Sequence, residues 1–429
     1  MKSIKYTVTN IIGLIIICIS FIPLYNRYLT HQRDDRFDFS AQTLLLEYFL
    51  VIVLGLLLLI AKKYSINKAF AAKIRFLTFS IIIYTLLTFV SALLSQDVTR
   101  SLGLFAFGSI GPLLLYLIIS YKIPASTKNL QYFVSVFIIS NVLYLLIAYL
   151  FAFRHGFTTD LLATRTGKNI YGSNSVIGAI SFILPLIFIN RRKLVSLVTK
   201  NIYLRLFGIM AVVWIIISLS RWGYATAMLT FLLTAYSINK SLSLRNIVLV
   251  FVVFSIVAYI IPDVSELIIF RFTGSSSLDS FTLVNILDVT LGEGRLLRWE
   301  NAFDNVIGKN LLFGIGLGNN YLVDLLGNSD AHNLFINMLI EQGLLAFMAI
   351  LLVLTAIYQL VKRISKTTAN QNIKVLVLSL GIGILIFHFW SITGGTYIQA
   401  GGIISAVKNY YFFIAMGIIA YTSKLEGQL

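Results

Sequence analysis

The stretch with the most chemistry-bearing side chains runs from Gly292 to Gly343. It carries Arg295, Arg298 and His332 and lies between two long apolar runs. Guanidinium groups bind phosphate oxygens through paired hydrogen bonds and stay charged when partly desolvated. Histidine can accept a proton near neutral pH. These residue types, next to membrane-like segments, predict a site that handles an anionic, membrane-anchored molecule at the lipid surface.

Residues 295–307 (RLLRWENAFDNVI) are predicted to form a short amphipathic helix. Arg295 and Arg298 are three residues apart, so they project from one side of such a helix. The helix could lie at the membrane interface with both guanidiniums aimed inward. The alternative is an ordinary surface helix whose arginines contact lipid phosphates or nearby acids. One mostly apolar face is formed by Leu296, Trp299 or Glu300, Phe303 and Ile307.

Three further features are candidates for the same site. Asp330 could orient the ring of His332, although a structural histidine at a membrane boundary is the alternative. Arg221, beside Trp222, marks an outer membrane boundary, where it either binds substrate or extends its side chain to the interface. The GIGLG run at 314–318 follows no strand of a βαβ unit, which argues against a dinucleotide-binding loop. It is either flexible backbone near a substrate or a plain loop.

Long apolar runs recur along the 429-residue chain, in which 58% of residues are hydrophobic and 12% are charged. Runs of about 18 or more apolar residues can cross the hydrocarbon core as helices. Helices are expected because backbone groups in lipid must pair within their own segment. The chain is therefore predicted to be an all-α integral membrane protein with about twelve transmembrane helices, at 9–25, 43–61, 74–94, 101–121, 130–152, 171–190, 204–220, 222–238, 246–262, 334–361, 375–393 and 405–422.

This pattern divides the chain into three parts. Residues 1–262 contain spans one to nine, and residues 334–429 contain spans ten to twelve. Between them, residues 263–333 form the only connection long enough to fold over the membrane surface. Because long loops often carry function, the chemistry is expected in this large outer loop, with its short amphipathic helices.

Basic residues are distributed unevenly between the two sides. Of the 34 lysines and arginines, 21 fall in segments that share a side with Met1, against a single acid, Glu426. The positive-inside rule therefore places both termini in the cytoplasm. Ten of the 13 remaining cations are arginines, a preference that topology does not require. Phosphate binding would explain this preference for arginine. The alternative is that outer loops only need a side chain that stays positively charged.

Composition also limits the function classes. The formal net charge of +17 mostly records topology, so it does not indicate a nucleic-acid partner. The single cysteine, Cys18, excludes a disulfide framework and a thiolate metal site. The outer acids form no DxD-type pair, and the arginines could neutralise charge in place of a cation. Neither a metal nor a cofactor is expected.

The order of the motifs resembles the O-antigen polymerase and ligase superfamily. The resemblance covers roughly residues 160–350, and the first of its motifs lies at 165–180. Each motif alone is weak, but their order, spacing and sidedness together are specific. The motifs are RTG…GSNSVIGAI, then SRWGYATAM, GRLLRWENAF, GIGLG and AHNLFINMLIEQGL.

The resemblance implies a GT-C-like membrane glycosyltransferase. It would transfer a glycan from undecaprenyl pyrophosphate to an acceptor sugar, with inversion at the anomeric centre. Arg221 and Arg295 would hold the pyrophosphate, and His332 would act at the acceptor hydroxyl. Helix geometry adds Arg298, and Arg165 and Asn333 complete the candidate binding set. The protein would reside in a bacterial cytoplasmic (inner) membrane with its active site on the periplasmic face.

Three roles stay open. A polymerase would extend O-antigen or capsule on a second lipid-linked repeat unit, possibly under a chain-length regulator. A ligase would join the glycan to lipid A-core. A transporter or flippase for lipid-linked sugars is a third possibility, but such proteins commonly place ionisable residues at mid-membrane. Here most span centres lack charged residues, which favours chemistry at the outer surface.

Overall fold

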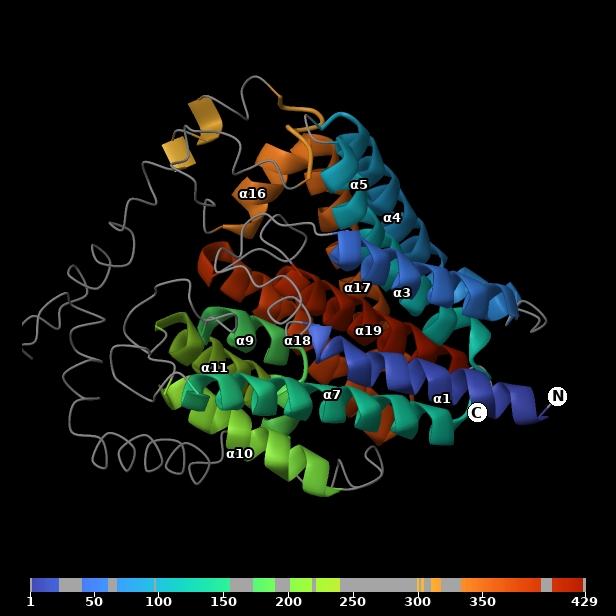
Figure 1. Ribbon diagram of the computed structural model, residues 1–429. Helices are drawn as coiled ribbons and strands as arrows, with labels where there is room; N and C mark the ends of the chain where they lie inside the picture. Colours follow the sequence, from blue (N-terminus) through green and yellow to red (C-terminus); the bar gives the residue numbers. More distant parts are fainter. Residues whose placement is uncertain are drawn as a thin grey trace, which may run out of the picture.

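The computed structural model describes residues 2–22, 41–60, 68–95, 98–154, 173–189, 201–217, 221–239, 299–300, 302–304, 310–317, 333–394 and 403–426. Every regular element in these ranges is a helix, and no strand occurs in them. The predicted all-helical class is therefore confirmed for the described part of the chain. The helices form one bundle, with the two chain ends on the same side of it (Figure 1).

Five described helices are long and apolar enough to cross a membrane. These spans are Ala71–Leu93, Ser101–Lys122, Thr127–Leu150, Gly343–Thr367 and Gln371–Phe389. Four of them belong to single helices: α4 (Lys68–Leu93), α7 (Thr127–Arg154), α17 (Gly343–Thr367) and α18 (Gln371–Gly394). The span Ser101–Lys122 is a run of four consecutive helical segments: α5 (Val98–Phe105), η2 (Ala106–Ile110), α6 (Gly111–Leu117) and η3 (Ile118–Lys122). All five coincide with predicted spans.

Five other apolar helices also coincide with predicted spans. They are α1 (Lys2–Ile19), α3 (Ala41–Ile60), α10 (Asn201–Ile217), α11 (Arg221–Thr234) with η6 (Ala235–Asn239), and α19 (Ile403–Leu425). Large hydrophobic side chains on the outside of the bundle, such as Phe49, Phe79 and Ile209, are exposed. Such an apolar exterior is suited to lipid. The predicted span at 246–262 lies outside the described residues.

Two predicted spans are not continuous helices. The span at 171–190 consists of α9 (Ser173–Ile180), a turn, and the 3-10 helix η4 (Leu184–Phe188), which begins next to Pro185. The span at 334–361 consists of α16 (Leu334–Glu341) and α17, which meet at Gln342 and Gly343. Gly343 has a φ of +78°, a left-handed conformation that turns the chain between the two helices. Apolar content alone does not reveal such breaks.

The central helix of the bundle is α19. It packs against α4, α6, α7, α9, α17 and α18. Its side chains Tyr410, Tyr411 and Tyr421 are fully buried. A Cβ atom at Gly111 of α6 would overlap the hydroxyl of Tyr410, so the absence of a side chain there lets the two helices approach closely.

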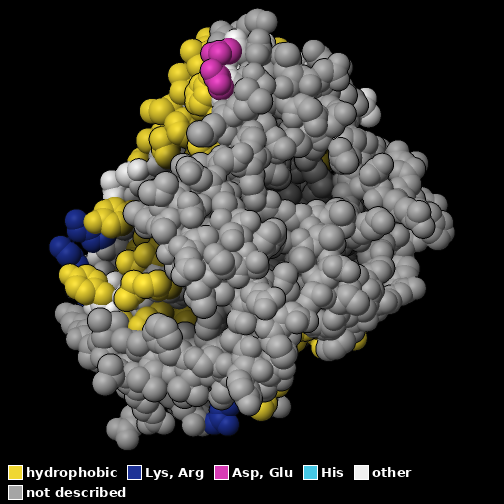
Figure 2. Space-filling model, turned by 90° about the vertical axis from the view of Figure 1, so that its left-hand side faces the viewer, with side chains coloured by type: hydrophobic (Ala, Val, Ile, Leu, Met, Phe, Trp, Pro, Cys, Tyr) yellow, Lys and Arg dark blue, Asp and Glu magenta, His cyan; other side chains and the backbone are white. Residues whose placement is uncertain are grey.

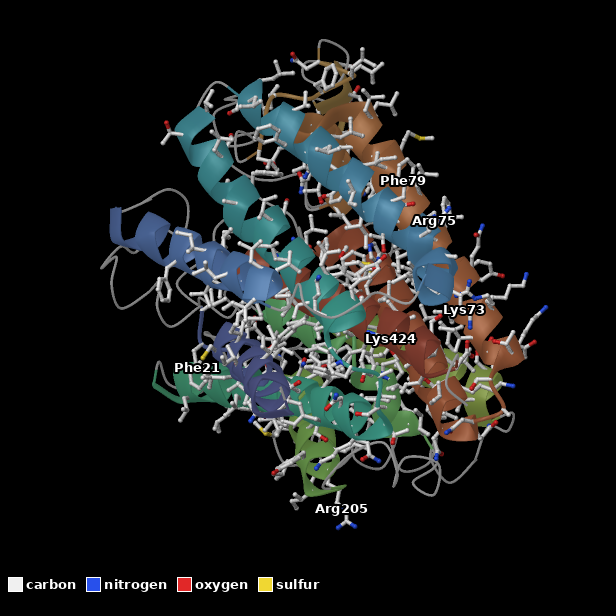
Figure 3. The ribbon with its side chains drawn as sticks, turned by 90° about the vertical axis from the view of Figure 1, so that its right-hand side faces the viewer. Phe21, Lys73, Arg75, Phe79, Arg205 and Lys424 are labelled. Atoms are coloured by element: carbon white, nitrogen blue, oxygen red, sulfur yellow. The ribbon has the colours of Figure 1, made fainter. Side chains whose placement is uncertain are left out.

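Figure 3 looks onto the end of the bundle that carries both termini. The side chains of Lys73, Arg75 and Arg205 are exposed at this end and point away from the helices. Lys424, in the last turn of α19, donates hydrogen bonds to the carbonyl oxygens of Tyr121 at 3.2 Å and Ile123 at 2.9 Å. This is the end that the charge pattern predicts to be cytoplasmic.

Candidate functional site

The start of α16 is fixed by Asn333, one of the predicted binding residues. Asn333 has an extended backbone, with φ −141° and ψ 119°, and its Oδ1 atom accepts hydrogen bonds from the N–H groups of Phe335 (2.9 Å) and Ile336 (3.2 Å). Asparagine at this position satisfies amide donors that have no partner within the helix. The side chain is buried. Asn333 thus sets where α16 begins, two residues after His332.

The predicted amphipathic segment packs on α16. Trp299 and Ala302 contact a small cluster formed by Ile336 and Ile340 of α16, with Ile315 and Leu339 at its edge. Residues 299–300 and 302–304 are helical, which confirms helical structure in this part of the predicted 295–307 helix.

The buried side of this segment differs from the predicted face. Phe303, expected on the apolar face with Trp299, is 49% exposed, and Glu300 is exposed as well. The small Ala302 side chain lets the segment approach α16, and Phe303 then points about 100° around the helix, away from the contact. Trp299 and Ala302 therefore define the side that meets α16.

The GIGLG run docks on the junction between α16 and α17. The N–H of Ile315 donates to the carbonyl of Ile340 at 2.8 Å, and the N–H of Gly316 donates to the carbonyl of Glu341 at 2.9 Å. The N–H of Leu344 donates to the carbonyl of Leu311 at 2.7 Å. The first two bonds occupy the last carbonyls of α16, which have no partner within the helix, and the third joins the start of α17 to the loop. The run is therefore a structured connection that holds the end of α16.

Glycine is required at these contacts. Gly314 has a φ of +69° and Gly316 a φ of +97°, and a Cβ atom at either would overlap a neighbour. At Gly314 the neighbour is the backbone of Glu341, and at Gly316 it is Ser95. The loop therefore lies too close to α16 for a side chain at Gly314, and too close to the end of α4 for a side chain at Gly316.

Side chains from α4 and α5 attach this assembly to the membrane helices. Ser91 donates to the carbonyl of Glu341 at 2.7 Å, and Ser101 donates to the carbonyl of Leu317 at 2.5 Å. Tyr84 and Thr88 both donate to Oε1 of Gln342 at 3.2 Å. Helix α16 and the GIGLG run are thus held against α4 and α5, and the amphipathic segment is held there through its contact with α16.

The other predicted site residues are described only in part. Arg221 is the first residue of α11, which packs against α9, α18 and η4, while α16 also packs against α18. Both α11 and α16 lie on the side of the bundle opposite the chain ends (Figure 1). Arg165, Arg295, Arg298 and His332 lie outside the described residues, so their predicted roles stay predictions.

The face on this side is partly apolar. Figure 2 shows hydrophobic side chains gathered along one flank, with Asp or Glu side chains at its top and Lys or Arg side chains lower down. The exposed hydrophobics of α17 include Met348 and Leu352.

Residues 206–351 match the family model described as O-antigen ligase. This match covers about a third of the chain and supports the resemblance to the O-antigen ligase and polymerase superfamily. No curated protein matches it. The matched range contains α11, the amphipathic segment, the GIGLG run and α16, and it excludes the stretch at 165–180.

Within the described residues, no three His, Cys, Asp or Glu side chains are grouped so that they could hold a metal ion. Metal independence remains a prediction that activity measurements must test.

Several residues that build this assembly around α16 could not be identified from sequence. Ser91 and Ser101 are hydroxyls within apolar helices, and their partners are carbonyls more than 200 residues away in the chain. Gly343 follows an apolar run that was predicted to continue as one helix. The only available signal was the sequence EQG at 341–343, a polar pair followed by glycine, which is typical of a helix end.

Proposed function

We propose that this protein transfers a glycan from undecaprenyl pyrophosphate to an acceptor sugar hydroxyl at the periplasmic face of the cytoplasmic membrane. The observation that supports this proposal most is the assembly of three separate motif segments. Residues 299–300, 302–304, 310–317 and 333–342 form one unit around α16. Trp299, which follows Arg298, and Asn333, which follows His332, both belong to this unit.

Two arginines would bind the diphosphate of the donor lipid. Arg295 precedes Trp299 by four residues and Arg298 precedes Ala302 by four, so on a continuous helix both guanidiniums share the side that meets α16. Arg221 at the start of α11 and Arg165 would complete the site. Charge on the diphosphate grows as the glycosidic bond breaks, and preorganised guanidiniums stabilise that charge best in a site without water.

His332 would accept the proton of the acceptor hydroxyl. The hydroxyl oxygen attacks the anomeric carbon from the face opposite the diphosphate, a new glycosidic bond forms, and undecaprenyl pyrophosphate leaves. A base of ordinary imidazole pKa suits this step near neutral pH. Asn333, held in its cap, orients the chain that carries the base.

The acceptor distinguishes two roles. As a polymerase, the enzyme would join the growing glycan to a repeat unit on a second lipid carrier, and the large outer loop favours this role. As a ligase, it would join the glycan to lipid A-core, a role favoured by the description of the matching family model. Deleting the gene separates them, because loss of a polymerase leaves single repeats on the core and loss of a ligase leaves the core bare.

Alanine variants of purified protein in detergent test the proposed site. Arg221→Ala, Arg295→Ala and His332→Ala are each expected to lower the transfer rate at least about thirtyfold, equivalent to about 2 kcal/mol of transition-state stabilisation. Arg205→Ala is the matched control, because Arg205 is exposed at the opposite end of the bundle. Unchanged turnover in the histidine variant would remove its role as base.

A further inference from the structure

Two cations lie close together where α19 ends beside η3, at the end of the bundle that carries both chain termini (Figure 3). Lys424, in the last turn of α19, is half-buried and donates hydrogen bonds to the carbonyl oxygens of Tyr121 and Ile123. Lys122 lies between these two residues in the chain and is half-buried as well. It is close enough to Lys424 for the two positive charges to repel each other. Packing therefore holds two like charges together at this point.

A third cation comes from α4. The hydroxyls of Thr78 and Tyr121 share a hydrogen bond of 2.7 Å, which holds this turn of α4 against η3. Arg75 precedes Thr78 by three residues, so it projects from a neighbouring position on the same side of the helix. Its side chain is exposed. We call Arg75, Lys122 and Lys424 the basic cluster. They come from three elements that are distant from one another in the sequence.

Among the described side chains, only one acid lies at this end of the bundle. It is Glu426, which accepts a hydrogen bond from Thr367 at 3.1 Å and interacts electrostatically with Arg363 of α17. The other described carboxylates belong to the unit around α16 at the opposite end. Glu426 carries a single charge that Arg363 already attracts. The described part of this end therefore keeps an excess of positive charge at the basic cluster.

The positive-inside rule alone does not require this arrangement. The rule concerns the sum of the cations on one side of the membrane, and cations that lie apart satisfy it without repelling each other. Arg205 of α10 shows such a placement, since it is exposed at the same end but apart from the basic cluster (Figure 3). Holding like charges together costs free energy unless an anion lies near them. The basic cluster therefore favours a bound anion.

The side chains next to the cluster indicate which anion fits. Phe76 and Phe79 follow Arg75 toward the middle of the span and are 44% and 58% exposed. Such exposed apolar side chains are suited to acyl chains, so Arg75 lies where hydrocarbon gives way to phosphates. Basic sites between membrane helices on the cytoplasmic side bind lipid headgroups. We propose that the basic cluster binds the phosphate of an anionic phospholipid in the leaflet at this end.

Such a lipid would link three elements of the bundle. Its phosphate oxygens would accept hydrogen bonds from the guanidinium of Arg75 on α4 and the ammonium of Lys122 on η3. The charge of Lys424 on α19 adds to the attraction. A ligand that binds only the folded protein stabilises it, and here it would hold α4 and η3 against the central helix. Because the basic cluster and the unit around α16 lie at opposite ends, this proposal does not depend on the proposed function.

Thermal unfolding of the purified protein in an uncharged detergent tests this site. Phosphatidylglycerol is expected to raise the unfolding temperature until the site is saturated, whereas phosphatidylcholine and inorganic phosphate at the same concentrations are not. Arg75→Gln and Lys122→Gln are each expected to raise the half-saturating concentration of phosphatidylglycerol about fivefold. Lys122→Arg, which keeps the charge, retains the wild-type value. Arg205→Gln is the matched control, because it removes an exposed cation at the same end of the bundle.

Three results would overturn the proposal. Phosphatidylglycerol that stabilises no more than phosphatidylcholine would show that the charge is not recognised. Equal stabilisation by inorganic phosphate would assign the basic cluster to a soluble anion. An equal loss of affinity in Arg205→Gln would show that binding follows the total charge of this surface. If Lys122→Gln does not elute as a folded species, Arg75→Gln decides, and an unchanged half-saturating concentration in that variant overturns the site.

Discussion

At the scale of single residues, Asn333 combines a structural contact with a predicted role in binding. Its Oδ1 atom caps α16 through two backbone amides, while the neighbouring position is the proposed base. The two roles can be separated because aspartate can accept the same hydrogen bonds but carries no amide donor.

Substituting Asn333 is expected to lower stability only where the new side chain cannot accept the two capping hydrogen bonds. Asn333→Ala should lower the free energy of unfolding by about 1 kcal/mol, because two amides at the start of α16 lose their acceptor. Asn333→Asp should unfold at the wild-type temperature. Thermal unfolding in detergent measures both variants, and an Asn333→Ala protein as stable as the wild type would show that the cap contributes nothing.

Sequence patterns indicated some residues of the two proposed sites and missed others for physical reasons. Asn333 was predicted only as a binding residue, and the structure shows that it caps α16. Lys122 and Lys424 were visible only as two of the cations on the cytoplasmic side. Their closeness depends on how η3 packs against α19, which is a property of tertiary packing.

At the scale of elements, the break between α16 and α17 shapes the site. Without the left-handed turn at Gly343, the two helices would continue as one rod, and the GIGLG run would lose the carbonyls on which it docks. A hydropathy window cannot detect this break, because one polar pair and a glycine barely change the mean of a long apolar run. The same limitation applies to the turn between α9 and η4.

Substituting Gly343 should therefore loosen the whole assembly. Gly343→Ala forces a Cβ atom into the left-handed region and against the carbonyl of Leu312, so we expect a loss of more than about 2 kcal/mol in unfolding free energy. Gly55→Ala is the control, since a Cβ atom there meets nothing within 4 Å. It should be neutral or slightly stabilising in helix α3. Equal stability of the two variants would contradict the proposed importance of the turn.

At the scale of the whole molecule, orientation decides whether the site can meet an outer-leaflet lipid. Five described spans and the distribution of basic residues agree with a multi-pass membrane protein. The side on which the motif unit lies remains a prediction from charge. Sequence is informative here because the positive-inside rule sums many residues and tolerates errors in any one span.

Labelling of single cysteines tests this orientation. In a Cys18→Ser background, Asn310→Cys should react with a membrane-impermeant maleimide in cells whose outer membrane has been permeabilised, because Asn310 is exposed beside the GIGLG run. Glu426→Cys should react only after the inner membrane is disrupted. The reverse pattern of labelling would place the site in the cytoplasm and exclude an outer-leaflet donor.

The central claim is glycan transfer from a lipid diphosphate without a metal ion. Its most direct measurement is the yield of free undecaprenyl pyrophosphate from purified wild-type protein and lipid-linked glycan, in detergent with EDTA. We predict one undecaprenyl pyrophosphate released for each glycosidic bond formed, at the rate seen without EDTA. Complete loss of transfer in EDTA with recovery on adding Mg²⁺ or Mn²⁺, or bond formation without release of the diphosphate, would contradict it.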